Sequence, residues 1–287
     1  MYFKIMGGKE GWHVKDLLRA AHALGFKSDV SDFRLLSHSL INPGPSTDKS
    51  GEPECIIVRT MPQGSLEQVV FRMDVLHALG RMGRKVINPP RSLESAVDKF
   101  LASELLQSKG LDIPPTFCCQ DAETAMDAFT KLGGDVVVKP LFGAEGRGIM
   151  RIEDEQLAWR VFKAVEKIEG VIYMQPFIKH PGWDLRIFVL GDKVLGGMKR
   201  IAPNGAWKTN VAQGGKGETY KLNSKLEEIG IRATRAVGAE IAGVDLILDK
   251  DGKWFVLEVN AVPGWKAFAP VTGIDIAREI LVYANKS

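Results

Sequence analysis

The sequence has no long apolar segment, few cysteines and no excess of one charge. No stretch of its 287 residues approaches the roughly 18 consecutive apolar residues that a membrane-spanning helix needs. Lys4 and a pair of glycines stand where a signal peptide would carry its apolar run. The 38 Lys and Arg residues nearly balance 35 Asp and Glu residues, so the cationic field that drives nonspecific nucleic-acid binding is missing. We expect a cytoplasmic protein that binds neither membranes nor nucleic acids.

The cysteines exclude two further classes. Three cysteines cannot form the disulfide framework that holds small secreted domains together. Cys118 and Cys119 are adjacent, so they lack the two-residue spacing of a zinc knuckle, and Cys55 opens a short apolar run. We expect all three to be reduced side chains that pack in the interior.

Local patterns predict a small α/β unit in the first 90 residues. Gly25 supplies a stop after a helically spaced apolar segment, and Asn88-Pro-Pro interrupts regular structure further on. These breaks place a domain boundary near 90–95. The expected elements are a helix over 14–24, a strand over 55–58, a helix over 65–82 and a helix from Val97 to Gly110.

Strands and helices alternate in the rest of the chain, which indicates an α/β class protein. Two strand pairs are joined by Gly191-Asp192 with its neighbours and by Asp251-Gly252, both of which are hairpin signals. The expected strands are 136–139, 171–174, 185–190, 193–199, 243–248 and 253–259, and the expected helices are 157–168, 224–241 and 275–284.

Asp245, Glu258 and Asn260 form the first candidate site. If the last hairpin closes around 249–252, residues whose numbers sum to 501 are opposite each other, so Asp245 would face Val256. Side chains alternate along a strand, so all three oxygen-bearing residues would share one face and converge. Such oxygen ligands suit Mg²⁺. From spacing alone, a hydrated acidic edge with its Asn in a turn is an equal alternative.

A strand that ends in Lys139 leads into a loop with three glycines, Gly143, Gly146 and Gly148. Glycine allows backbone N–H groups to approach an anion closely, and a lysine at the strand end adds charge for a phosphate. The spacing differs from both the P-loop and the Rossmann fingerprint. Taken alone, the segment is better explained as a simple turn.

Further polar candidate residues are Lys99 and a set that lies at and after the first predicted hairpin. A solvated Lys99 beside Asp98 and surface salt bridges along the hairpin are the alternatives to a functional role. Arg186 and Arg200 are on separate strands, so counting residues does not fix whether they point the same way. The remaining members of the set are Asp184, Lys199, Lys208, Thr209 and Asn210.

Taken together, these motifs resemble the ATP-grasp superfamily, in particular the RimK-type α-L-glutamate ligases. The resemblance covers roughly residues 50–270 and depends on the order of the motifs, because none is specific by itself. They are Asp98-Lys99, Pro114-Pro115-Thr116, Val138-Lys139-Pro140 with its glycine loop, the segment Tyr173 to Ile178, Asp184-Leu-Arg186, Lys199-Arg200, Thr209-Asn210, Gly243-Val-Asp245 and Glu258-Val-Asn260.

The resemblance implies a role for each matching residue. Lys99 and Lys139 would contact ATP phosphates beneath the glycine loop, and Asp184 would hold the ribose side. Pro176 departs from the acidic residue usual in the adenine-binding hinge, and Lys208 from a common arginine. The other implied assignments are Gly143, Ala144, Gly146 and Gly148 in the loop, Gln175, Pro176, Phe177 and Ile178 in the hinge, Lys208 and Thr209 at the nucleotide, Arg200 and Asn210 at the transferred phosphate, and Asp245, Glu258 and Asn260 at Mg²⁺ or Mn²⁺.

The resemblance also implies an α/β ATP-grasp fold with a Rossmann-like N-terminal domain. The expected domains are 1–92, 93–178 with the glycine loop, and 179–287 with the metal site. The implied activity is ATP-dependent ligation, in which an acceptor carboxylate becomes an acylphosphate and is joined to the amine of L-glutamate. Relatives of this type commonly self-associate, so a homo-oligomer is expected.

The acceptor is the least determined part of this hypothesis. The segments 58–60, 64–72 and 263–265 look most like the branch that acts on pterins. Arg59, Arg72 and Arg186 could hold substrate carboxylates, or they could form ion pairs within the protein. A ligase for a peptide or amino-group carrier protein and an ATP-binding regulatory or scaffold protein without turnover are the alternatives. The intact set of lysine, arginine and metal-ligand residues argues against the scaffold.

Overall fold

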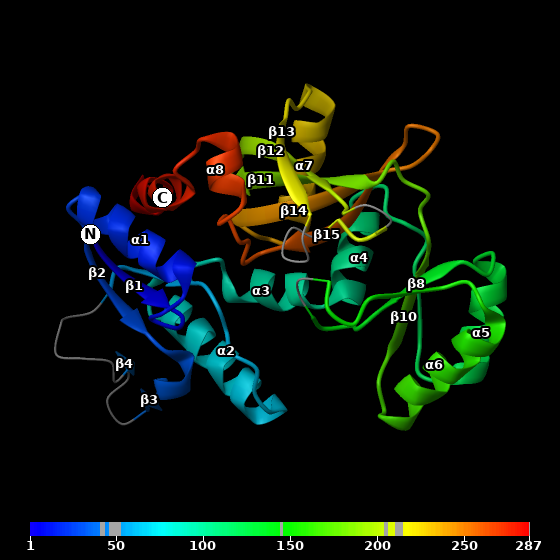
Figure 1. The fold of residues 1–287 in the computed structure, drawn as a ribbon. Coiled ribbons are helices and arrows are strands. Elements are labelled where there is room, and N and C mark those ends of the chain that lie inside the picture. Colours follow the sequence, from blue (N-terminus) through cyan, green and yellow to red (C-terminus); the bar gives the residue numbers. More distant parts are fainter. Residues whose placement is uncertain (41–43, 46–52, 144–145, 204–205, 210–214, 287) are drawn as a thin grey trace.

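The computed structural model describes residues 1–40, 44–45, 53–143, 146–203, 206–209 and 215–286. Three main sheets follow one another along the chain. The helices α3 (Pro90–Val97) and α4 (Lys99–Ser108) lie in the middle of the molecule, between the first sheet and the other two (Figure 1).

The first sheet is parallel and has the strand order β2-β1-β5-β6. Every residue of β1 and β5 is buried, and strands covered on both faces carry continuous apolar runs. The predicted strand 55–58 is confirmed, whereas β1 was not predicted. The elements are β1 (Tyr2–Met6), α1 (Trp12–Ala23), β2 (Lys27–Ser31), a 3₁₀ turn (Phe33–Leu35), the small pair β3 (His38–Ser39) and β4 (Gly44–Pro45), β5 (Cys55–Val58), α2 (Leu66–Arg81) and β6 (Lys85–Ile87).

The second sheet is antiparallel, and α5 and α6 cover one of its faces (Figure 1). It contains the predicted strand 136–139 and two short strands that were not predicted, β7 and β9. The elements are β7 (Phe117–Cys119), α5 (Ala122–Lys131), β8 (Val136–Lys139), β9 (Met150–Ile152), α6 (Glu155–Lys167) and β10 (Ile172–Pro176).

The third sheet is also antiparallel, with the strand order β13-β12-β11-β14-β15. Both predicted hairpins are present, one between β11 and β12 and one between β14 and β15. The elements are β11 (Trp183–Leu190), β12 (Lys193–Ile201), β13 (Lys216–Tyr220), α7 (Ser224–Ala236), β14 (Ile241–Leu248), β15 (Trp254–Asn260), α8 (Phe268–Thr272) and α9 (Ile276–Lys286).

Two predicted helix boundaries were wrong. The helix expected over 224–241 ends at Ala236, and Gly238 then adopts a φ of +71° before β14 begins. The helix expected from Val97 begins at Lys99, because the Asp98 carboxylate caps it by accepting hydrogen bonds from two backbone N–H groups. Val97 instead ends α3.

Segments from both ends of the chain share one hydrophobic cluster. Phe3 and Ile5 of β1 and Leu17 of α1 pack together with Ile276 and Ile280 of α9. Figure 1 shows α1 and α9 on the same side of the molecule, near the labels of the two termini. The three domain ranges expected from the sequence stay a prediction, but this core joins the first range to the last.

Residues 261–266, here called the 261–266 loop, follow β15 and are held by side chains from the N-terminal part of the chain. Asn88 donates from Nδ2 to the carbonyls of Ile241 (2.7 Å) and Ala261. Its Oδ1 accepts from the N–H groups of Glu240 and Ile241. His13 Nε2 accepts from Trp265 N at 3.0 Å. The N-terminal segment therefore fixes the loop that begins directly after the candidate ligand Asn260.

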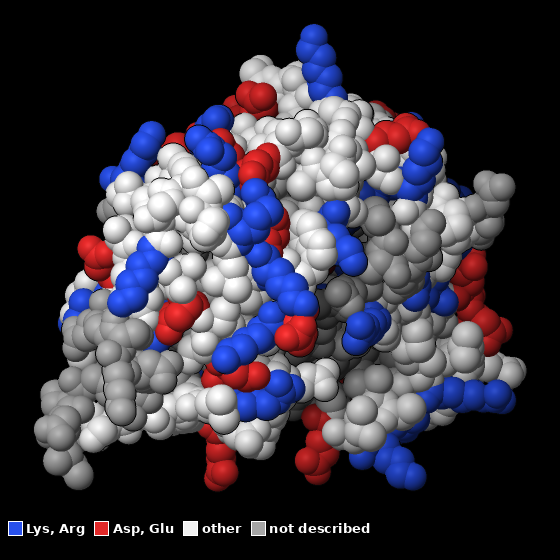
Figure 2. All heavy atoms as spheres, turned by 60° about the vertical axis from the view of Figure 1, so that its left-hand side comes forward, with Lys and Arg blue, Asp and Glu red and all other residues white. Residues whose placement is uncertain are grey.

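The surface shows no concentration of one charge on the face drawn in Figure 2. Lys and Arg side chains are interspersed there with Asp and Glu, so this face has no single-sign field. None of the described helices is both long and apolar enough to span a bilayer. Of the cysteines, Cys55 is buried as expected, while Cys118 and Cys119 are half-buried, and all three are free.

Replacing Asn88 with alanine should destabilise the fold strongly. The change leaves two buried carbonyls, one buried N–H group and one partly buried N–H group without their partner, which we expect to cost about 2–4 kcal/mol. Chemical denaturation measures this loss. Asn223→Ala is the matched control, because Asn223 caps α7 through one hydrogen bond and its loss should cost about 1 kcal/mol. Equal losses in both variants would contradict the bridging role of Asn88.

His13 should make stability depend on pH. Burial, with a further contribution from the charge of Arg59, lowers the pKa of His13 from 6.5 to about 4. Because the folded pKa is the lower one, the unfolded state binds the additional proton first, so stability falls as the pH drops from 6.5 toward 4. Between about pH 7.5 and about pH 5.5 we expect a loss of about 1 kcal/mol after allowance for partial exposure.

His13→Gln tests this assignment. Glutamine offers a carbonyl acceptor but does not titrate, so urea unfolding of the variant should lose this part of the pH dependence. If the free energy of unfolding of the variant depends on pH as strongly as that of the wild-type protein, other groups cause the dependence.

Candidate active site

A cavity lies between the second and third sheets. Its apolar lining includes Val137, Ile149, Ile178, Ile247 and Leu257, and its charged lining includes both candidate lysines. A pocket with apolar walls and a few convergent polar groups is the usual form of a small-molecule site. The predicted site residues that line it are Lys99, Lys139, Gly146, Gln175, Pro176, Phe177, Ile178, Asp184, Arg200, Lys208, Thr209, Asp245 and Glu258.

Other predicted residues lie elsewhere. Asn260, Gly143, Gly148, Arg59, Arg72 and Arg186 are not part of the cavity lining. Ala144 and Asn210 lie outside the described residues.

Sequence reasoning missed the apolar lining, although a signal was present. Ile247 follows Asp245 by two positions on β14, and Val137 precedes Lys139 by two positions on β8. Side chains two apart on a strand face the same way, so both could have been assigned to the walls.

Lys99 and Lys139 extend into the cavity from different elements. Lys99, in the first turn of α4, donates from Nζ to the carbonyl of Gly143 at 3.0 Å. Lys139, at the end of β8, donates to Gln175 Oε1 at 2.8 Å. Burial lowers the pKa of Lys99, and it lowers that of Lys139 to about 8. Both ammonium groups are therefore poised to gain stability from an anion that enters the cavity.

A hydrogen-bond network fixes the orientation of the Gln175 amide. Its Nε2 donates to Thr116 Oγ1 at 2.9 Å and to Tyr173 Oη at 2.8 Å. Tyr173 Oη also contacts Ser103 Oγ at 2.9 Å. With Nε2 held in this way, the carbonyl oxygen of the amide must face Lys139.

The predicted hinge offers few free backbone donors. Pro176 has no N–H, and the N–H of Phe177 donates to the carbonyl of Asp135 at 2.8 Å. The Phe177 ring lies under the guanidinium of Arg151, 3.7 Å from ring centroid to Cζ, and Arg151 is itself paired with Asp135. Within the described residues, the N–H of Ile178 forms no backbone hydrogen bond. Ile178 is therefore the hinge position whose donor can serve a ligand.

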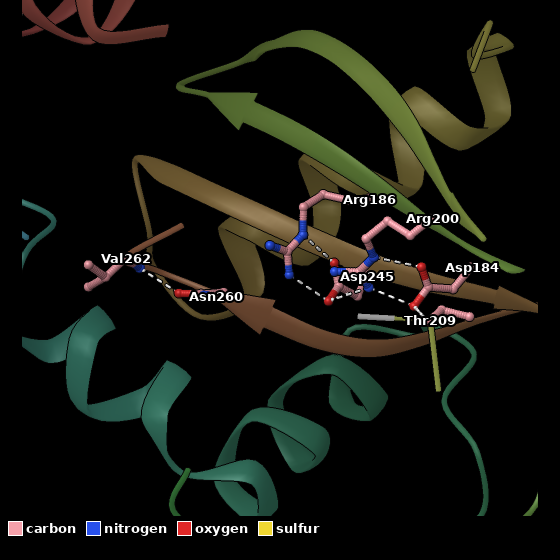
Figure 3. Close-up of polar contacts among 7 residues, drawn as sticks. All are labelled: Asp184, Arg186, Arg200, Thr209, Asp245, Asn260 and Val262. Atoms are coloured by element: carbon pink, nitrogen blue, oxygen red, sulfur yellow. Dashed lines mark hydrogen bonds and ion pairs between the residues drawn. The ribbon is translucent and has the colours of Figure 1, made fainter. Parts of the chain in front are cut away.

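Two arginines and two aspartates alternate across the third sheet (Figure 3). Strand register places Asp184 opposite Arg200 and Arg186 opposite Asp245. Arg200 donates to both oxygens of Asp184 at 2.7 and 2.6 Å and to Asp245 at 2.9 Å. Arg186 donates to both oxygens of Asp245 at 2.7 Å. The two arginines therefore share one face, which residue counting had left open.

These contacts shift the pKa values of Asp245 and Arg200. Burial alone would raise the pKa of Asp245, but the charges and hydrogen bonds of Arg186 and Arg200 outweigh it and lower the pKa. Burial opposes the charge on Arg200, but the two carboxylates prevail and raise the pKa of its guanidinium. Asp184 also accepts from Thr209 Oγ1. Both Asp184 oxygens are thus engaged with protein groups, which favours a role in holding Arg200, and the ribose contact stays a prediction.

The register of the last hairpin differs from the expected one. Asp245 is opposite Glu258 and not opposite Val256. The hairpin closes one position away from the expected register, since Leu246 is opposite Val256, and an irregularity between Asp245 and Leu246 adds a second position at Leu257. Gly243 is opposite Asn260, so the three candidate ligands do share a face.

The expected convergence of all three ligands is not present. Asn260 Oδ1 accepts from Val262 N at 2.8 Å, and Figure 3 shows this side chain turned toward Val262 and away from Asp245. Asp245 and Glu258 line the cavity, whereas Asn260 does not. The structure therefore brings together two of the three predicted metal ligands.

Comparison with known proteins agrees with this geometry. The model of the RimK-like ATP-grasp domain matches residues 96–284. The chain is 33% identical to the tetrahydromethanopterin:α-L-glutamate ligase of Methanosarcina acetivorans, over 96% of this chain and 95% of that protein. It is 31% identical to a probable α-L-glutamate ligase of Chromohalobacter salexigens, over 96% and 92%.

Solved structures share the fold at low sequence identity. The ATP-grasp ligase PsnB, complexed with a minimal precursor, superposes with a TM-score of 0.79 at 18% identity and covers 99% of both chains. The D-alanine–D-alanine ligase of Bacillus anthracis, complexed with ATP, gives a TM-score of 0.71 at 16% identity, over 100% of this chain and 96% of that chain. The α/β ATP-grasp fold expected from the motifs is confirmed, and the chain belongs to the RimK-like ATP-grasp family.

Proposed function

We propose that this ATP-grasp ligase joins an acceptor carboxylate to the amine of L-glutamate, with ATP as the source of activation. Its family and its relatives, which are named α-L-glutamate ligases, support carboxylate–amine ligation. The observation that carries the proposal is the cavity that combines apolar walls, two half-buried lysines, and Asp245 opposite Glu258.

ATP fits this cavity by its chemistry. The base would lie against the apolar lining, with the N–H of Ile178 as a hydrogen-bond donor. Lys99 and Lys139 would contact the phosphates, and each would recover the stability that burial takes from its charged form. The glycine loop, whose carbonyl at Gly143 already contacts Lys99, would cover the phosphates.

The donor set also fits a divalent metal ion. Asp245 and Glu258 are hard oxygen ligands on directly opposite strand positions, beside the two lysines at the same cavity. Asp245 Oδ2 accepts from both Arg186 and Arg200, whereas Oδ1 accepts from Arg186 alone and keeps a lone pair for a metal ion. The two carboxylates would hold Mg²⁺ or Mn²⁺, which supplies charge neutralisation between phosphates. Asn260 is the third predicted ligand, although its Oδ1 is engaged with Val262 in this structure.

The reaction requires activation because an oxide is a poor leaving group. An oxygen of the acceptor carboxylate attacks the terminal phosphorus of ATP, which breaks the bond to ADP and forms an acylphosphate. The glutamate amine then attacks the acyl carbon, loses a proton, and expels phosphate. Arg200, held from two sides by carboxylates, would stabilise the charge that gathers on the transferred group. Asn210 is proposed for the same role from the sequence motif.

The acceptor is proposed to be a pterin-type cofactor. The support is similarity over almost the full chain to a ligase named for tetrahydromethanopterin. A precursor peptide, as in the PsnB complex, is the alternative acceptor.

Phosphate release tests the function. The protein is incubated with ATP, Mg²⁺ and L-glutamate, with and without a tetrahydropterin or peptide that carries a free carboxylate. Release that requires both glutamate and an acceptor, together with a product whose mass corresponds to one added glutamate, supports ligation. Tight ATP binding without release under all these conditions would support the non-catalytic alternative.

Gln175→Leu should weaken nucleotide binding. The change removes the acceptor that orients Lys139, so we expect affinity for ADP to fall by about tenfold, or about 1.4 kcal/mol. Calorimetric titration measures it. Gln175→Glu, which keeps an acceptor for Lys139, is the control and should bind better than the leucine variant. Equal affinity in the wild-type and leucine proteins would contradict the orienting role.

Arg200→Lys should lower kcat by at least about tenfold, with nucleotide affinity changed by less than about threefold, because a lysine keeps the charge and loses the paired contacts to two carboxylates. Steady-state kinetics and ADP titration separate the two effects. A loss confined to nucleotide affinity would show that Arg200 anchors ATP in the ground state instead.

A further inference from the structure

Arg59 is a buried cation that has no carboxylate partner among the residues that the structure describes. Its exposed fraction is 5%. One guanidinium nitrogen, Nη2, donates to the carbonyl of Pro263 at 2.9 Å, and Cζ lies 4.4 Å from the ring centroid of Trp265. Nε is buried and has no hydrogen-bond partner. Burial lowers the pKa of this guanidinium to about 9.

Two of the other buried cations in the described chain have carboxylate partners. Arg200 is held by Asp184, and Lys4 is paired with Asp29 at 3.4 Å. Removing a charge from water is costly unless a counter-charge compensates for it. The unpaired Nε of Arg59 therefore indicates a place where a small anion would gain an unusually favourable contact.

The position of Arg59 is a common place for ligands in parallel sheets. In the order β2-β1-β5-β6, the chain runs from β1 to β2 on one side, and β5 lies on the other. Ligands of open parallel sheets bind at the carboxyl ends of the strands where the order reverses in this way. Arg59 directly follows β5, and its N–H donates to the carbonyl of Met6 at the end of β1.

Backbone groups at this edge add to the site. A Cβ on Gly7 would lie 3.3 Å from Arg59 Cβ, so the turn after β1 approaches Arg59 closely. The helix α1 starts at the same edge, and its N-cap Gly11 provides no side-chain cap for the first N–H groups. The dipole of α1 favours a negative charge at this end of the helix.

We propose that Arg59, with the backbone after β1, binds a carboxylate that does not react, on one of the two substrates of the ligase. This inference rests on the proposed function. The fork of an arginine matches the two oxygens of a carboxylate. L-Glutamate carries two carboxylates that do not react when its amine is the nucleophile, and an acceptor with a second carboxylate has one.

The link between this site and the reaction centre is the 261–266 loop. Pro263 accepts from Arg59, and the same loop continues β15, which carries Glu258. Arg72 is also buried and donates to the carbonyl of Pro62 at 2.8 Å, but none of its nitrogens is both buried and unpaired. The observations therefore single out Arg59.

Ligand titration of the full chain, loaded with Mg²⁺ and a non-hydrolysable ATP analogue, tests the proposal. The probes are L-glutamate, its γ-amide L-glutamine, its α-amide isoglutamine, and glutarate as a dicarboxylate without an amine. If the glutamate carboxylate is anchored, one of the two amides should bind the wild-type protein about 30-fold more weakly than glutamate. Arg59→Met keeps side-chain bulk against Trp265. In this variant the affinity for glutamate should fall by the same factor, and glutamate and its amides should then bind equally well.

The variants and probes distinguish the two sources of the carboxylate. Loss of glutamate affinity in Arg59→Met assigns the site to the amine donor, and loss of glutarate affinity alone assigns it to the acceptor. Arg59→Lys should retain part of the affinity. Arg91→Met, at an exposed arginine of α3, should change none of it. Unchanged affinity and discrimination in Arg59→Met, or no binding of either ligand to the wild-type protein, would overturn the proposal.

A measurement on the wild-type protein covers the case in which Arg59→Met does not fold. In protein labelled with ¹⁵N at arginine Nε, the Arg59 signal is the one lost in Arg59→Lys. It should shift on addition of the bound dicarboxylate and stay unchanged with the diamide of glutaric acid. An Arg59 signal that does not move at saturation would refute the contact. Nucleotide affinity and phosphate release are measured separately, so a failure of the ligase function would be seen independently of this site.

Discussion

The shared carboxylate of Asp245 is the contact on which the candidate active site depends. Arg186 donates to this carboxylate from the adjacent strand β11, and Arg200 reaches it from β12. Asp184 of β11 also pairs with Arg200. Positive and negative groups alternate, so each buried charge has an opposite neighbour. The removal of one member would leave the others buried without compensation. This interdependence fixes the direction of four side chains at once.

The predictable part of the fold was local. The strand at 55–58 and that at 136–139 are short β-branched runs, and the turn at Gly191-Asp192 defines a hairpin without help from the rest of the chain. β1 was missed because a lysine interrupts its apolar run, and only the complete structure shows that Asp29 compensates for this charge.

The unpredictable part was non-local. The hairpin closes one position away from the expected register and the additional residue at Leu257 adds a second, so the expected partner of Asp245 was off by two positions, although the shared face of Asp245 and Glu258 was correct. Motif order located the cavity residues, but it could not show that Asp184 holds Arg200 or that Asn260 turns toward its own loop. Such pairings depend on contacts between separate strands, which spacing along one strand does not encode.

The packing of α9 against the first sheet affects how the protein is made. Phe3 and Ile5 share a cluster with side chains such as Ile276 and Ile280, which are synthesised more than 250 residues later. The early sheet must therefore wait with an incomplete apolar face during translation, a state that favours aggregation. The first sheet is therefore complete only after α9 has been made.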